Sequence, residues 1–169
     1  SATGEVLCIS VSLKPAPEKK QPSLTRSLII NAYQNVSKIY PNITTLDIRQ
    51  NPVPFFDGRL PNEMADENTY KFYHLLLNSK GIFIGIPVYW NAISGSFKNF
   101  IELMCGPAYD PRVKGTPFKK KLVSFFIVGD DEESTVYGTQ QVTSIFKKLG
   151  SEIVGKPLKI ANSKKIQEQ

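Results

Sequence analysis

Apolar and polar positions alternate in blocks along the chain, and these blocks predict a succession of strands and helices. Short apolar runs predict strands at residues 5–12, 43–48, 81–86, 122–128 and 153–160. Apolar residues spaced three or four apart predict helices at residues 24–36, 66–78, 96–104 and 139–149. Because strands that alternate with helices form parallel sheets, the order predicts a three-layer α/β sandwich with a five-stranded parallel sheet and helices on both faces.

Several residues are expected to mark where these elements begin and end. Pro87 is expected to end the third strand, since it has no backbone N–H to donate. Gly150 is predicted to end the last helix in a left-handed conformation. No linker or internal repeat interrupts the order, so residues 1–169 are expected to form a single domain. The polar residues 161–169 are expected to form a loose tail.

The composition narrows the compartment in which the chain is expected to work. A hydrophobic content of 41% and a charged content of 21% are ordinary for a soluble globular protein. No apolar run is long enough to span a membrane, and no secretory signal is recognised. Cys8 and Cys105 lie far apart in apolar segments, which predicts two buried free thiols and a cytoplasmic location.

The net charge of +6 raises the question of a nucleic-acid partner. The lysines, however, occur in short separated runs without the interleaved aromatic residues of single-strand binders. We therefore expect no nucleic acid as a partner. The charge favours instead an attraction for small anionic ligands.

Ligands of a parallel α/β sheet bind beyond the carboxyl ends of its strands, where three loops are predicted, at residues 10–27, 87–95 and 129–138. In the first loop, hydroxyl and cationic side chains surround a helix start, whose free N–H groups favour an anion. A well-capped helix behind a disordered loop, without an anion site, is the alternative interpretation. The candidate anion-binding residues are Ser10, Ser12, Lys14, Ser23, Leu24, Thr25 and Arg26.

The second and third loops suggest a platform for a flat ligand, although a packed loop fits the second equally well. The candidates are Pro87, Val88, Tyr89, Trp90 and Asn91, followed by Gly129, Asp130 and Asp131. Neither the phosphate-binding pattern GxxxxGK[ST] nor the dinucleotide pattern GxGxxG is present. His74 is the only histidine, and neither a nucleophile motif nor a zinc pattern is found, so no metal site is expected. Any catalysis should therefore come from a cofactor.

Over nearly its whole length the chain resembles the NADPH-dependent FMN reductase family of flavodoxin-like proteins. The stretch ISVSLK at residues 9–14, with SLTRSL at 23–28, is similar to the family's phosphate loop. LDI at 46–48, with PVPFFDGRLP at 52–61, resembles its second motif. PVYWNAISG at 87–95, with FKNFIE at 97–102, resembles its third motif and is the most specific match.

The resemblance implies FMN as the cofactor, with Ser12, Ser23 and Thr25 holding the phosphate and Lys14 or Arg26 assisting. It implies that residues 87–91 lie along the isoalloxazine and that residues 129–131 border its other end. It further implies NADPH or NADH as co-substrate, a small-molecule electron acceptor, and a homodimer or homotetramer.

Three functions are compatible with this resemblance. The leading one is an oxidoreductase of the flavin or quinone reductase type, which transfers hydride from NAD(P)H through FMN to a second acceptor. A flavodoxin-like one-electron carrier is the second, although such carriers are typically acidic and this chain is basic. A binding or regulatory module without turnover is the third, and its best support is Val11 in place of the family's glycine.

Overall fold

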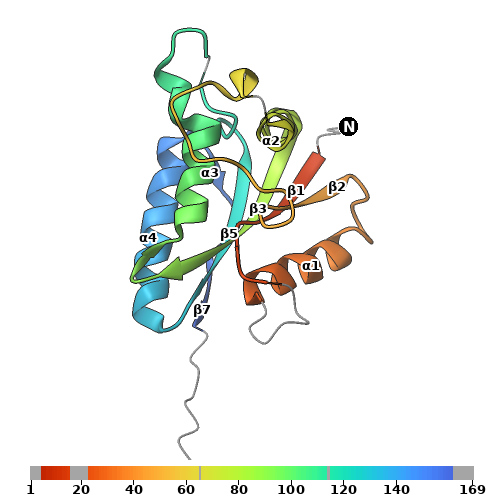
Figure 1. Cartoon of the computed structure of the whole chain (residues 1–169). Helices are drawn as coiled ribbons and strands as arrows, with labels where there is room; N and C mark the ends of the chain where they lie inside the picture. The colour runs from red at the N-terminus through yellow and green to blue at the C-terminus, as the bar shows by residue number, and fades with distance from the viewer. Residues whose placement is uncertain (1–4, 16–22, 65, 114, 162–169) are drawn as a thin grey trace, which may run out of the picture.

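The computed structural model describes residues 5–15, 23–64, 66–113 and 115–161 of the 169. Within these ranges one sheet contains β1 (Glu5–Ser10), β2 (Ile43–Asp47), β3 (Ser79–Tyr89), β4 (Ala92–Ile93), β5 (Leu122–Gly129), β6 (Glu152–Ile153) and β7 (Leu158–Ala161). The α-helices are α1 (Leu24–Val36), α2 (Glu67–Asn78), α3 (Gly95–Cys105) and α4 (Glu132–Lys148). There are also two short 3-10 helices: η1 (Pro61–Glu63) precedes α2 along the chain, and η2 (Gly106–Tyr109) follows α3 (Figure 1).

The sheet has the order β2-β1-β3-β5-β6, and the strands along this path are parallel. β7 pairs in parallel with the carboxyl half of β5, and β4 pairs with the end of β3 in the antiparallel sense. The predicted parallel α/β sheet is confirmed, but the count of five strands is wrong. The predicted strand 153–160 is divided at Gly155, whose φ is +73°, and a hairpin adds β4.

The expectation that Pro87 ends its strand is wrong, because β3 continues past it and Pro87 pairs with Val128 of β5. On the other side of β3, the Gly85 carbonyl accepts a hydrogen bond from Val11 N at 3.4 Å, just where β1 ends. Pro87 lies two residues further on, so its backbone faces the same side, beyond β1. Since β1 no longer runs alongside at this point, the strand needs no N–H donor at position 87. The Pro87 carbonyl accepts a hydrogen bond from Ser94 N at 3.1 Å.

The predicted start of the last helix at residue 139 is also wrong, since α4 begins seven residues earlier, at 132 (139 − 132 = 7). Asp131 is its N-cap and accepts a hydrogen bond from Ser134 N at 2.7 Å. Gly138 lies inside the helix, and glycine is needed there because a Cβ would come within 2.4 Å of Val88 Cγ2 on β3. Because Gly129 belongs to β5, the loop after this strand shrinks to residues 130 and 131.

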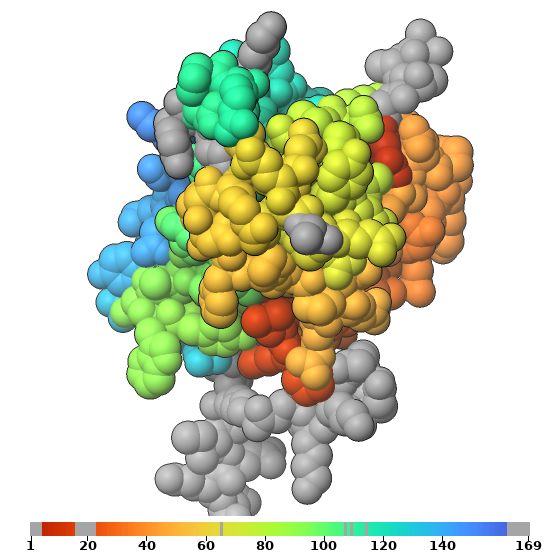
Figure 2. Space-filling view, turned by 45° about the horizontal axis from the view of Figure 1, so that its top comes forward, coloured from red at the N-terminus to blue at the C-terminus, as the bar shows by residue number. Residues whose placement is uncertain are grey.

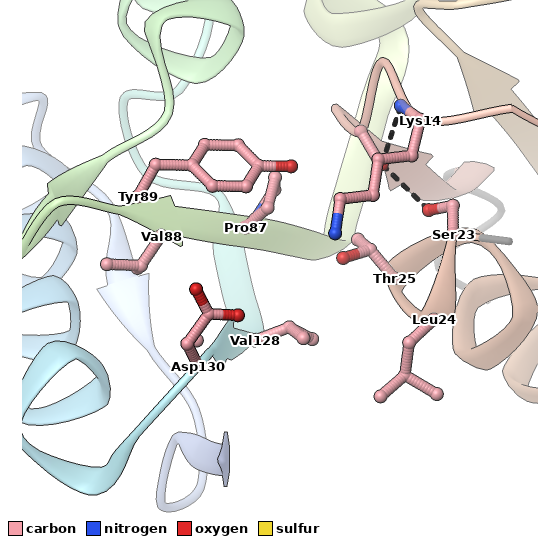
Figure 3. Close-up of a pocket in the computed structure, with 11 residues that line it drawn as sticks. Lys14, Ser23, Leu24, Thr25, Pro87, Val88, Tyr89, Val128 and Asp130 are labelled. Atoms are coloured by element: carbon pink, nitrogen blue, oxygen red, sulfur yellow. Dashed lines mark hydrogen bonds between the residues drawn. The ribbon is translucent and has the colours of Figure 1, made fainter. Parts of the chain in front are cut away.

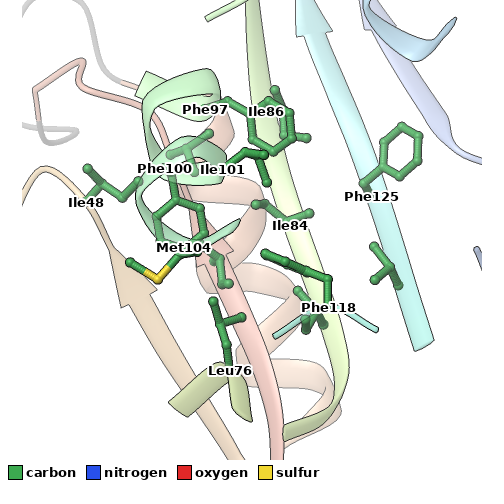
Figure 4. Close-up of a cluster of buried hydrophobic side chains, with 14 of the residues drawn as sticks. Ile48, Leu76, Ile84, Ile86, Phe97, Phe100, Ile101, Met104, Phe118 and Phe125 are labelled. Atoms are coloured by element: carbon green, nitrogen blue, oxygen red, sulfur yellow. The ribbon is translucent and has the colours of Figure 1, made fainter. Parts of the chain in front are cut away.

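Helices cover both faces of the sheet, as predicted, with α1 on one face and α2, α3 and α4 on the other (Figure 1). Neighbouring residues of β5 supply both layers, because successive strand side chains point to opposite faces. Phe126 packs in a cluster with Ile29 of α1, whereas Phe125 packs with Phe146 of α4. The larger cluster fills the space between the sheet and α2, α3 and α4 (Figure 4).

Both cysteines are buried free thiols, as the sequence predicts. Burial raises the pKa of the Cys8 thiol to about 11 and raises that of Cys105 as well. Both therefore stay protonated at neutral pH and behave as packing groups.

Gly150 has a φ of +85°, which confirms its predicted left-handed role after α4. Ala161 belongs to β7, so the tail expected from residue 161 begins inside a strand, and residues 162–169 lie outside the described part of the chain. None of the helices in the described ranges combines the length and hydrophobicity that a membrane crossing requires.

Candidate functional site

A cavity lies at the carboxyl edge of the sheet, where the chain leaves β1, β3 and β5 (Figure 3). The direction of the connections changes between β1 and β3, which is the topological switch point of such a sheet. This main cavity is lined by Ser12, Lys14, Ser23, Leu24, Thr25, Pro87, Val88, Tyr89, Val128, Gly129 and Asp130. The structure thus brings together most of the predicted residues. Val128 was missed, because an apolar residue inside a strand run carries no local signal of a binding role.

The polar end of the main cavity is built around the start of α1. Ser23 is the N-cap, and its Oγ accepts from Arg26 N at 3.1 Å and donates to Ser12 Oγ at 2.7 Å. The predicted cap of the helix at Ser23 is thus present. Leu24 and Thr25 form the first turn beside the cavity, and amides at such positions have no partner within the helix. The hydroxyls of Ser12 and Thr25 and the positive end of the helix dipole can therefore face the same anion.

Val11, which stands where the family has glycine, is fully buried within the larger hydrophobic cluster. Its carbonyl accepts a hydrogen bond from Ser96 Oγ at 2.6 Å, which fixes the backbone at the end of β1. The Val11 side chain is thus directed into the core and does not narrow the main cavity. The longer part of the first loop, residues 16–22, lies outside the described residues.

Arg26 does not have the role predicted for it. Its guanidinium is buried, forms an ion pair with Asp47 of β2, and donates to the carbonyls of Ser12, Lys14 and Pro15. These contacts occupy the N–H groups of the guanidinium, so direct assistance to a phosphate is not supported. Arg26 instead fixes the path of the loop that carries Ser12 and Lys14.

Ser10 lies beneath the main cavity and does not line it. It is buried at the end of β1, and its Oγ accepts a hydrogen bond from Ser12 N at 3.4 Å.

Lys14, in contrast, is exposed, and among the described lining residues it is the only cation. Its Nζ lies 5.8 Å from the centroid of the Tyr89 ring. Lys14 is therefore the side chain placed to neutralise an anion at the polar end of the main cavity.

The β3–β4 hairpin turns through Trp90 and Asn91, whose φ angles are +54° and +59°. Two consecutive positive φ values are those of a type I′ turn, which joins strands tightly. Asn91 Oδ1 accepts from Ser134 Oγ at 3.1 Å, and Gln141 Oε1 accepts from Ile93 N at 2.9 Å. The hairpin is thereby held against α4, and Trp90 is left 99% exposed at its tip.

The predicted platform is consequently divided between two hollows. Pro87, Val88 and Tyr89 line the main cavity, whereas Trp90, Asn91 and Asp131 do not. These three line an adjoining side cavity together with Tyr89, Asp130 and Ser134. Tyr89 and Asp130 line both cavities.

Charge is distributed unevenly along the site. Burial, and to a lesser degree the negative charge of Asp130, raise the pKa of Tyr89, so its phenol remains protonated at neutral pH. Hydrogen bonds from Ser134 lower the pKa of Asp131, which therefore remains ionised. The site is cationic where α1 begins and acidic where α4 begins.

A sequence model of the NADPH-dependent FMN reductase family matches residues 6–164. The chain belongs to this family. Membership makes it an NAD(P)H-dependent oxidoreductase and a flavoprotein with FMN as its cofactor. A search of curated proteins gave no match.

Solved structures show the same fold at low sequence identity. The flavoenzyme NAD(P)H:(acceptor) oxidoreductase FerB from Paracoccus denitrificans has a TM-score of 0.69 and 14% identity, covering 94% of this chain and 79% of that chain. An azoreductase from Bacillus anthracis has a TM-score of 0.65 and 15% identity, covering 94% and 88%. The flavodoxin of Fusobacterium nucleatum bound to flavin mononucleotide has a TM-score of 0.54 and 14% identity, covering 90% and 70%. The predicted flavodoxin-like fold is confirmed.

Proposed function

We propose that this protein is an oxidoreductase of the flavin or quinone reductase type, which takes electrons from NAD(P)H and passes them by way of FMN to a small second acceptor. The observation that carries the proposal is the main cavity, which joins an anion-binding helix start to an apolar slot at the ends of β3 and β5. A ligand that carries a phosphate on a flat ring system matches the chemistry of both halves. When bound, FMN supplies the electron-transfer chemistry.

The protein's own groups would bind and orient the cofactor. Ser12, Thr25 and Lys14, with the first amides of α1, would hold the phosphate, and Arg26 keeps the loop that carries Ser12 and Lys14 in place. Val88, Val128 and Tyr89 would contact the ring, and the side cavity with Trp90 would offer a second surface close to it.

Two observations favour this proposal over its alternatives. The binding module drew its support from Val11, whose side chain lies in the core and leaves the main cavity open. A one-electron carrier docks on large partners, typically through an acidic surface, whereas this chain has a net charge of +6.

We expect FMN to bind more tightly than riboflavin, because only FMN reaches the start of α1. Thr25→Val should weaken FMN binding by about 1–3 kcal/mol, the range for a hydrogen bond to a charged group, and leave riboflavin binding unchanged. Titration with quenching of flavin fluorescence measures both constants. The matched control is Thr143→Val on the outer side of α4. Equal affinities for FMN and riboflavin would rule out the phosphate site.

We also expect NADPH or NADH to bleach the FMN-loaded protein fully under anaerobic conditions. Addition of an acceptor should restore the colour, and steady-state rates should follow ping-pong kinetics, because the two substrates use the same redox centre in turn. Absorbance in a stopped-flow instrument is the measurement. If neither nucleotide changes the absorbance while dithionite does, the protein is a carrier.

A further inference from the structure

The outward side of α4 differs from an ordinary solvated helix surface. We call it the α4 face, and its residues are exposed or half-buried: Glu133, Tyr137, Gln140, Thr143, Ser144 and Lys147. Residues 134–146 contain no charged side chain, whereas the outer side of α3 carries the Lys98–Glu102 ion pair. The atoms of α4, azure to blue, reach the surface along the left margin of the molecule in Figure 2. Because the cores of protein interfaces are depleted of charge, the α4 face has the composition of a contact surface.

The two ends of the α4 face carry opposite charges. Glu132 and Glu133 lie in the first turn of the helix, and Lys147 and Lys148 lie in the last. All four are exposed, and none forms an ion pair within the described part of the chain. Charges in these places stabilise the helix through its dipole, but the dipole does not explain the uncharged middle. A second copy of the helix that runs antiparallel would place a basic end against each acidic end.

The middle of the α4 face combines a hollow with an exposed aromatic side chain. The shallow hollow is lined by Thr139, Gln140, Thr143, Ser144 and Lys147. The last four are spaced i, i+3, i+4 and i+7, which is the spacing of a hole that receives one side chain from a facing helix. Tyr137 lies one turn before this hollow and is 44% exposed. The face therefore supplies both a side chain to insert and a hole to receive it.

The charges and the hollow require the same alignment of two helices. In an antiparallel pair centred on Gln140, a residue seven positions before it lies opposite the residue seven positions after it in the second copy. Glu133 and Lys147 meet this condition (140 − 133 = 7; 147 − 140 = 7). Tyr137 then lies opposite Thr143 in the hollow, because both are three positions from Gln140 (140 − 137 = 3; 143 − 140 = 3). Two separate features thus indicate one two-fold axis.

We propose that the α4 face binds a second copy of this chain, with the two α4 helices antiparallel and the two-fold axis at Gln140. Tyr137 of each copy fills the hollow of the other, and Glu133 of each copy pairs with the partner's Lys147. Among the described residues, none lines both this hollow and the main cavity, so the pairing leaves the lining of the main cavity free. The inference goes beyond the proposed function and does not depend on it. Since one pair of helices forms a small interface, we expect a dissociation constant in the micromolar range.

Sedimentation velocity of the purified protein over a concentration series measures this dissociation constant. Tyr137→Ala should raise it by at least about tenfold, as expected for an aromatic residue near the centre of an interface. Tyr70→Ala, at a similarly exposed tyrosine of α2, is the matched control and should leave the constant unchanged. The free energy of unfolding of Tyr137→Ala, measured at concentrations where the wild type is monomeric, should equal that of the wild type. A lost dimer is then not a lost fold.

Charge reversal tests the antiparallel alignment. Glu133→Lys and Lys147→Glu should each weaken dimerisation, because each places like charges opposite one another at both ends of the pair. An equimolar mixture of the two variants should dimerise like the wild type, since one copy then supplies two lysines and the other two glutamates. The helix dipole cannot produce this rescue, because mixing changes neither chain. The assignment is overturned if the wild type stays monomeric throughout the series, if Tyr137→Ala or the single reversals leave the dimer intact, or if the mixture does not recover.

Discussion

Arg26→Ala is expected to lower the free energy of unfolding by about 3–5 kcal/mol, the range for removing one partner of a buried ion pair. The substitution leaves the Asp47 carboxylate, whose side chain is only 14% exposed, without its cation. It also removes the donors to three carbonyls of the first loop. Urea unfolding followed by circular dichroism measures the change.

The Arg26 variant also tests the positioning role. FMN binding should weaken in Arg26→Ala, although the guanidinium does not line the main cavity, because the loop that carries Ser12 and Lys14 loses its anchor. Arg59→Ala is the matched control, since Arg59 pairs with Asp57 on the surface, where solvent screens the pair and its loss should hardly change stability. A loss of stability at Arg26 no larger than at Arg59 would refute the role assigned here.

Phe146→Ala is expected to destabilise the protein by about 3–5 kcal/mol, as found for large aromatic residues removed from cores. Phe146 is fully buried, and its ring centroid lies 6.0 Å from Phe97, 5.6 Å from Phe118 and 6.0 Å from Phe125. It therefore joins α4 to α3, to β5 and to the segment before β5. The lost contacts leave a void that rigid neighbours cannot close.

Chemical denaturation again provides the measurement. Tyr137→Ala, on the same helix but 44% exposed, should stay within about 0.5 kcal/mol of the wild type. Phe146→Leu should fall between the two, because it retains part of the buried volume. A change at Phe146 equal to that at Tyr137 would mean that α4 does not depend on this aromatic cluster.

Local pattern alone was enough to predict the order of elements and the edge of the sheet where the site lies. Short apolar runs marked β1, β2, β3 and β5, and helical spacing marked α1, α2 and α3, because these periodicities follow from backbone geometry. Ser23 identified the start of α1, since a serine cap acts within one turn. The residues that line the main cavity followed from the loops at the carboxyl ends, with Val128 as the exception.

What the sequence left open depends on partners that are distant along the chain. Pro87 is tolerated in β3 because β1 has already ended beside it, and position 138 of α4 needs glycine because Val88 lies against it. Arg26 turns away from the cavity because β2 places Asp47 within reach. The path of residues 54–56 depends on Asn99, whose side chain accepts a hydrogen bond from Phe56 N, 43 residues earlier, and donates to the Pro54 carbonyl. Each outcome depends on which backbone or side chain lies opposite, and only the packing of strands and helices brings those groups together.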